Sequence, residues 1–156
     1  MTKDVREIVA SVKSLLGGSA AFTAGNSLLA VILPLRMDAA GYPVALTGAI
    51  MAAYSLGLAI GGLRAKRLIF RIGHIRAFAA FAALTAIATL AYAVFFHPAA
   101  WLMLRIVNGF CIAGLTATIE SWLNTRSSNE ARGRVLSFYM LTFYLATASG
   151  QTLVNL

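Results

Sequence analysis

Two ionisable side chains inside one long apolar stretch are the residues of this sequence best placed to do chemistry. Arg105 and Glu120 both lie in the stretch 99–123, and they are fifteen positions apart, which corresponds to about 22 Å along an α-helix. This separation is too long for a direct ion pair. Because an ionisable group in such a stretch is costly and tends to be functional, each of the two is predicted to serve a purpose of its own.

Arg105 has two interpretations at this stage. Its guanidinium can face a water-filled interior, where a fixed positive charge holds a substrate anion or stabilises a nearby carboxylate. Alternatively, since Arg105 lies about a turn and a half from the nearer end of its stretch, its long side chain can extend to the membrane surface. Glu120, near the other end, is predicted to form a salt bridge with Arg71 or Arg76, and direct proton carriage is the alternative.

Polar amides and one aromatic residue complete the set that can contact a solute. Asn26, in the middle of the stretch 15–35, and Asn108, beside Arg105, can hydrogen-bond either a solute or a neighbouring helix. Tyr144 belongs to a mixed polar and aromatic face that can line a cavity. The remaining aromatic residues, Tyr54 and Tyr92 among them, are predicted to pack or to face lipid.

Motifs of enzymes are absent from the sequence. There are no paired catalytic carboxylates, no phosphate-binding glycine loop and no nucleophile elbow. His74 and His97 have no metal-ligand neighbours in the sequence, and Cys111 is the single cysteine. The sequence therefore predicts no enzymatic activity, no cofactor and no metal site.

Five long apolar stretches must position these residues. Each has about 20 residues, the length with which an α-helix crosses ~30 Å of hydrocarbon. With 60% hydrophobic and 12% charged residues, the chain has too little polar surface to cover a water-soluble core. The sequence therefore predicts an all-α, polytopic membrane helix bundle in a lipid bilayer, with spans at about 15–35, 42–63, 77–96, 99–123 and 135–156.

Basic residues occupy the N-terminal arm and every second gap between the spans. The arm 1–14 carries three, and the positive-inside rule places it and the gaps 64–76 and 124–134 in the cytoplasm. The arm is predicted to form a short helix on the membrane surface, and 64–76 is predicted to be a long loop. Pro34 and the residues 38–43 are predicted to form the first external turn. The net charge of +8 is thus explained by topology, and nucleic acid is not a predicted partner.

Small residues recur at helical spacing in two spans. In the second span Ala49, Ala53, Gly57 and Gly61 follow one another every fourth residue, and Gly109 belongs to a similar stripe in the fourth span. Such stripes let two helix backbones approach closely. Gly57, Gly61 and Gly109 are therefore predicted to pack helices, either as ordinary bundle contacts or as a sliding contact between moving bundles.

Two segments resemble signatures of the major facilitator superfamily. KRLIFRIGHIR, residues 66–76, resembles its G-x-L-a-D-R-x-G-R-R loop, with Arg71 and Gly73 on the central arginine and glycine and Arg76 just past the basic end. Lys66 and Phe70 depart from the expected glycine and aspartate. The segment 105–111, RIVNGFC, resembles the R-x-x-q-G-x-g motif of the fourth span.

The resemblance implies a fold and a function. Members of the superfamily have twelve helices in two halves around a midplane cavity, so this chain is expected to be five helices of a truncated N-terminal half that needs the missing C-terminal half. The implied function is secondary active transport of a small solute by alternating access, coupled to protons, in a bacterial cytoplasmic membrane. Solute and coupling residues are then Asn26, Arg105, Asn108 and Tyr144, and the gating loop and charge network contains Arg71, Gly73, Arg76 and Glu120. A membrane scaffold or partner subunit that does not transport is the alternative.

Overall fold

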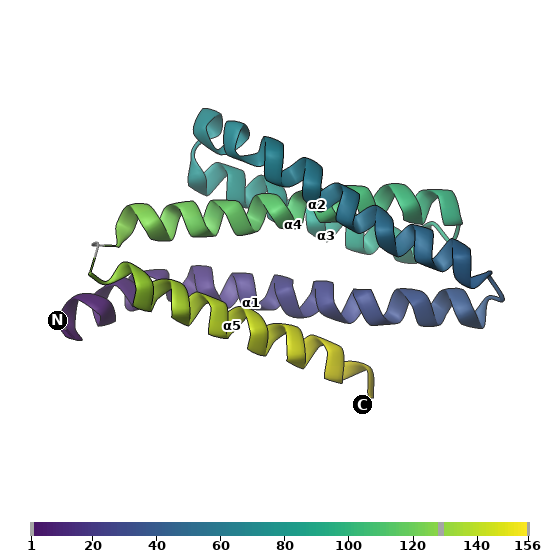
Figure 1. Ribbon diagram of the computed structural model, residues 1–156, viewed down its shortest axis with the longest axis horizontal. Coiled ribbons are helices and arrows are strands. Elements are labelled where there is room, and N and C mark those ends of the chain that lie inside the picture. Colours follow the sequence, from purple (N-terminus) through teal and green to yellow (C-terminus); the bar gives the residue numbers. More distant parts are fainter. Residues whose placement is uncertain (1, 128–129, 156) are drawn as a thin grey trace. The chain divides into compact units, whose positions relative to one another are not determined.

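The computed structural model describes residues 2–127 and 130–155, and within these ranges the chain is helical without strands. Figure 1 shows the order of the elements along the chain. They are α1 (Thr2–Ala39), α2 (Val44–Ile72), α3 (His74–Val94), α4 (Pro98–Arg126), α5 (Arg132–Thr152) and the short 3₁₀ helix η1 (Leu153–Asn155). The prediction of an all-α fold with five main helices is confirmed.

Four of the helices are long and apolar enough to cross a membrane. They are Leu16–Ala39 of α1, α2, α3 and Pro98–Thr125 of α4, with mean hydropathies between 1.5 and 2.0. In lipid a helix satisfies every backbone polar group internally, which explains why these apolar segments adopt no other structure. The prediction that α5 also spans the membrane stays a prediction, because its hydroxyl, amide and basic side chains make it more polar.

The connection between α2 and α3 is a single residue. The prediction that residues 64–76 form a long loop is therefore wrong. α2 continues to Ile72, and the N–H of Gly73 donates to the Ile69 carbonyl at 2.9 Å. Gly73 then turns the chain with a φ of 84°, a left-handed conformation that favours glycine. The physical reason is that Ala65 and Ile69 continue the buried face of α2 at helical spacing. The basic residues between them lie on the exposed face, so their charges do not interrupt the helix.

α1 is also longer than predicted. It begins at Thr2 without a helical break between the arm and the first span, and it continues through Pro34 to Ala39. The prediction that Pro34 closes the span is therefore wrong, because a membrane helix tolerates proline where its surroundings re-satisfy the freed backbone groups. The turn falls instead at Gly41, whose φ is 74°, and the position of the arm at a membrane surface stays a prediction.

The chain divides into two compact units. Unit 1 contains α1 up to Val31 and the chain from Ile119 onward, and unit 2 is Ile32–Thr118. In unit 1, α5 and α1 lie side by side (Figure 1), and a Cβ atom on Gly150 would overlap the Ala24 carbonyl oxygen. Since only glycine fits there, the backbones of α1 and α5 are in direct contact.

Unit 2 packs α2, α3 and most of α4. Every third or fourth residue of α2 and α3 is buried, which is the spacing of one helix face. On α3 this face is Ala77, Phe81, Thr85, Ala88 and Tyr92. The opposite faces carry large exposed apolar side chains such as Leu63, Ile87 and Leu90, as expected for a surface that contacts lipid.

Candidate functional site

The contact between α2 and α4 is made by glycines from both helices. A Cβ atom on Gly57 would overlap the Ile106 carbonyl oxygen, and one on Gly109 would overlap the Tyr54 carbonyl oxygen. On Gly61 a Cβ atom would lie 2.7 Å from its nearest α4 atoms. The three glycines therefore allow the two backbones to touch, and the side chains beside them are brought within reach of each other.

Arg105 lies beside this contact, held by α2. Its side chain is 1% exposed, so the guanidinium is packed inside the protein and does not extend to the surface. Nη2 donates to the Met51 sulfur at 3.3 Å, and the guanidinium carbon lies 5.5 Å from the centre of the Tyr54 ring. A thioether is a weak acceptor, and the cation–π contact is worth about 1–2 kcal/mol. These partners compensate the buried charge only in part.

Asn108 lies one turn further along α4 and is fully buried. Within the described residues, neither its Oδ1 nor its Nδ2 atom has a hydrogen-bond partner. Two other buried polar side chains of unit 2 are satisfied, since Thr85 and Thr118 donate to carbonyls one turn back at 2.8 and 2.7 Å. A buried amide left without partners costs about 1–3 kcal/mol, so Asn108 lowers the stability of the fold.

Trp101 and Tyr92 extend the same region. Their ring centroids are 6.2 Å apart in an edge-to-face arrangement, and both side chains are buried. The Tyr92 hydroxyl, Trp101 Nε1 and Arg105 Nε also have no hydrogen-bond partner in the part of the chain that the structure describes. We call Tyr54, Tyr92, Trp101, Arg105 and Asn108 the Arg105 cluster.

Sequence reasoning missed part of this cluster. It treated Tyr54 and Tyr92 as residues that pack or face lipid, and it did not consider Trp101. Two signals were present: Trp101, Arg105 and Asn108 follow at intervals of four and three, and Tyr54 precedes Gly57 by three, so each set shares one helix face. Tyr92 had no such signal, because its approach to Trp101 depends on how α3 packs on α4.

The two other predicted solute contacts belong to unit 1. Asn26 is half-buried on α1, and Tyr144 on α5 is 66% exposed with its ring 5.8 Å from that of Phe143. Because Gly150 faces Ala24 and the helices run in the same direction (Figure 1), Asn26 and Tyr144 lie roughly 12 Å apart along the axes. The structure does not bring these two residues together.

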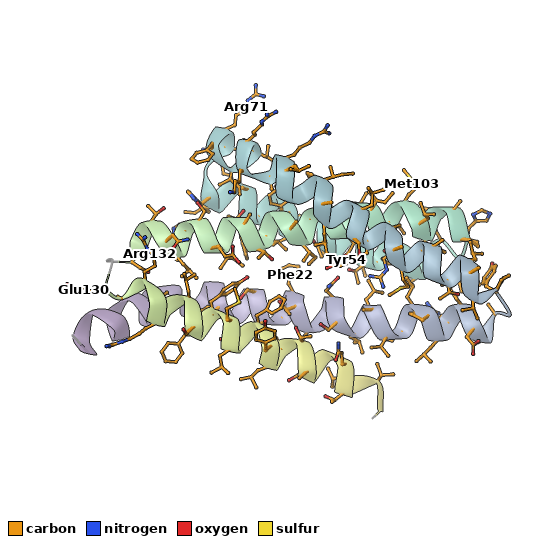
Figure 2. The ribbon with its side chains drawn as sticks, viewed as in Figure 1. Phe22, Tyr54, Arg71, Met103, Glu130 and Arg132 are labelled. Atoms are coloured by element: carbon orange, nitrogen blue, oxygen red, sulfur yellow. The ribbon has the colours of Figure 1, made fainter. Side chains whose placement is uncertain are left out.

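Two of the predicted gating residues, Arg71 and Arg76, lie at the ends of helices. Arg71 is in the last turn of α2, and Figure 2 shows its side chain directed away from the helices. Arg76 is in the first turn of α3, and both arginines are exposed. Glu120 is half-buried on α4 within unit 1. Its salt bridge with either arginine stays a prediction.

One surface hollow accompanies α5. It has a volume of about 510 Å³ and is lined by Glu130, Gly133, Arg134, Ser137, Phe138 and Leu141, all from α5 or the residues just before it. In the described ranges no three His, Cys, Asp or Glu side chains come together as metal ligands would. The hollow offers only a surface groove along one helix.

Long apolar helices joined by short connections define a multi-pass membrane protein. The particular family follows from the sequence match. Residues 15–155 match the model of the Major Facilitator Superfamily, and the chain belongs to this family. The resemblance seen in the two motifs is thereby confirmed.

Relatives in Salmonella carry the name "Uncharacterized MFS-type transporter YcaD". The chain is 30% identical over 144 residues to the protein of Salmonella arizonae and 29% identical to those of Salmonella newport and Salmonella typhi. These alignments cover 92% of this chain and 38% of each relative, so the chain spans less than half of their length. No solved structure matches the chain significantly.

Proposed function

We propose that this chain forms part of a secondary active transporter that carries a small solute across a bacterial cytoplasmic membrane by alternating access, coupled to protons. The membership of the Major Facilitator Superfamily and the transporter names of the relatives support this proposal. The observation that carries it is that Arg105 and Asn108 of the Arg105 cluster are buried inside a helix of membrane-spanning length. An ionisable residue at such a place typically marks a substrate or ion pathway.

The transport cycle assigns a role to each predicted residue. Arg105 and Asn108 bind solute or couple its movement to protons, and Asn26 and Tyr144 contact the solute from α1 and α5. Further helices outside this chain supply the second half around the central site. Arg71, Gly73, Arg76 and Glu120 form the cytoplasmic gate, with the N-terminus on the same side of the membrane.

A cysteine-accessibility experiment on the complete transporter tests the proposal. Cys111 is buried and is the single cysteine of this chain, so Cys111→Ala, with any cysteine elsewhere also removed, gives a clean background. In proteoliposomes, an Asn26→Cys variant should react with a membrane-impermeant maleimide from one side. Imposing a proton gradient should change that rate several-fold, because alternating access opens and closes the path to Asn26.

Met103→Cys is the matched control. Met103 is 61% exposed, and Figure 2 shows its side chain pointing outward from α4. Its labelling should be independent of the gradient. A gradient-independent rate at Asn26→Cys, together with no movement of any solute in a broad uptake panel, would contradict transport and favour a scaffold.

A further inference from the structure

Arg105 is buried in unit 2, and no acidic side chain of this unit is buried with it. The chain has five acidic residues, and Asp38 alone falls within unit 2. Asp38 is exposed near the end of α1, whereas Arg105 is buried against Met51 and Tyr54. A buried charge is normally paired, because burial removes the stabilisation that water gives it. Unit 2 therefore supplies no buried counter-charge for Arg105.

The cluster around Arg105 offers mainly hydrogen-bond donors. The buried groups without partners in the described chain include the N–H groups at Arg105 Nε, Trp101 Nε1 and Asn108 Nδ2, and the Tyr92 hydroxyl. A carboxylate only accepts hydrogen bonds, and the planar guanidinium fork matches its two oxygens. The chemistry of the cluster thus complements a carboxylate.

The amount of charge limits the ligand further. Arg105 is the only buried basic residue of unit 2, and the other arginines and lysines of the unit are exposed. One buried cation compensates one negative charge, so an inorganic phosphate dianion would leave a second charge uncompensated. The rings of Tyr54, Tyr92 and Trp101 provide apolar surface for an organic group attached to the carboxylate.

We infer that the Arg105 cluster binds the carboxylate of a small organic monoanion, with Arg105 pairing with the charge and Asn108, Trp101 and Tyr92 donating hydrogen bonds. Monocarboxylates are then the solute class of the transporter. The second statement rests on the proposed function, whereas binding itself does not require transport.

The experiment measures binding to the 156-residue chain in lipid nanodiscs. The chain has two tryptophans, so Trp122→Phe leaves Trp101 as a fluorescent reporter inside the cluster. Cyclohexanecarboxylate is the probe, cyclohexanecarboxamide is its neutral equivalent, and inorganic phosphate is the dianion control. We expect a saturable change in Trp101 emission with the carboxylate, and at least tenfold weaker binding of the amide and of phosphate.

Substitutions in the same background assign the effect to the cluster. Arg105→Gln should weaken carboxylate binding at least tenfold, Arg105→Lys should weaken it less because the charge remains, and Asn108→Leu should weaken it a few-fold. Circular dichroism and gel filtration check folding, and the Lys variant serves if the Gln variant does not fold. Equal binding of carboxylate and amide, preference for phosphate, unchanged binding in Arg105→Gln, or no saturable signal would each overturn the inference.

The two proposals fail separately. If labelling at Asn26→Cys depends on the gradient and no carboxylate binds, the proposal of a transporter stands and the proposed ligand class is rejected. If the chain binds the carboxylate but labelling in the complete protein is independent of the gradient and no solute moves, the proposed binding site stands and the proposal of transport is rejected.

Discussion

The glycine contact between α2 and α4 and the Arg105 cluster beside it follow opposite rules. At Gly57 and Gly109 the two backbones touch and no further atom fits. In the cluster, polar atoms of Asn108 and Arg105 are buried without hydrogen-bond partners in the described chain. Tyr54 takes part in both, because its carbonyl lies against Gly109 and its ring lies beside Arg105.

This difference separates stability from function within one pair of helices. Close packing stabilises the helix pair through van der Waals contacts, which are the main source of helix association in lipid. Buried unpaired polar atoms lower stability, so a sequence that retains them gains something other than stability from them. Substitutions in the first region should therefore change folding, and substitutions in the second should change activity.

Arg105→Ala should produce the largest effect. We expect transport of solute into vesicles by the complete protein to fall at least 100-fold, which corresponds to about 2.7 kcal/mol of lost transition-state stabilisation. The measurement is the initial rate of solute uptake or efflux, normalised to the amount of protein in the membrane. Unchanged kinetics would remove Arg105 from the mechanism and erase the contrast between the two regions.

Gly57→Ala should be the most destabilising change in the glycine contact. Its Cβ atom would overlap a backbone oxygen that cannot move aside, so we expect a loss of about 2–3 kcal/mol in the free energy of unfolding. Gly62→Ala is the matched control, since no atom lies within 4 Å of its Cβ position, and it should gain up to about 1 kcal/mol from helix propensity. Reversible unfolding in mixed micelles measures both, and equal effects would refute the close contact.

Asn108→Leu should have effects of opposite sign on stability and activity. Removing a buried amide without partners should raise the free energy of unfolding by about 1 kcal/mol, while transport falls. The same unfolding and uptake measurements test this. A loss of stability would show that Asn108 is a structural residue, and the two regions would then follow one rule.

Arg71→Ala should have the smallest effect on stability. Its side chain is exposed at the end of α2, so the free energy of unfolding should change by less than about 0.5 kcal/mol. We expect a change in transport rate or in the amount of protein inserted into the membrane, because the residue lies at the proposed gate. A large loss of stability would place Arg71 with the packed region and not with the gate.

Much of the fold was readable from the sequence because lipid restricts the alternatives. A long apolar segment in a bilayer adopts an α-helix, so the length of each apolar stretch was sufficient to predict it. The segment 64–76 was misjudged because its charges suggested a loop, whereas Ala65 and Ile69 continue the buried face of α2. The charges of this segment indicate on which side of the membrane it lies, and the spacing of its buried residues indicates that it is helical.

The candidate site was only partly predictable. Arg105 and Asn108 stand out because polar residues are rare in apolar stretches. Tyr92 lies beside Trp101 because of the angle at which α3 packs against α4. Met51 contacts the Arg105 guanidinium because of the angle at which α2 packs against α4. Such angles arise from many small contacts summed over whole helices, and no short sequence pattern encodes them.

Gly73 limits where this protein tolerates added sequence. One residue inserted between Gly73 and the body of α3 would rotate the rest of that helix by about 100° about its axis and shift it by about 1.5 Å. Tyr92, almost twenty residues away, would then point elsewhere. An epitope tag or a fluorescent-protein fusion therefore belongs in the turn at Gly41, where it would leave the register of α3 intact.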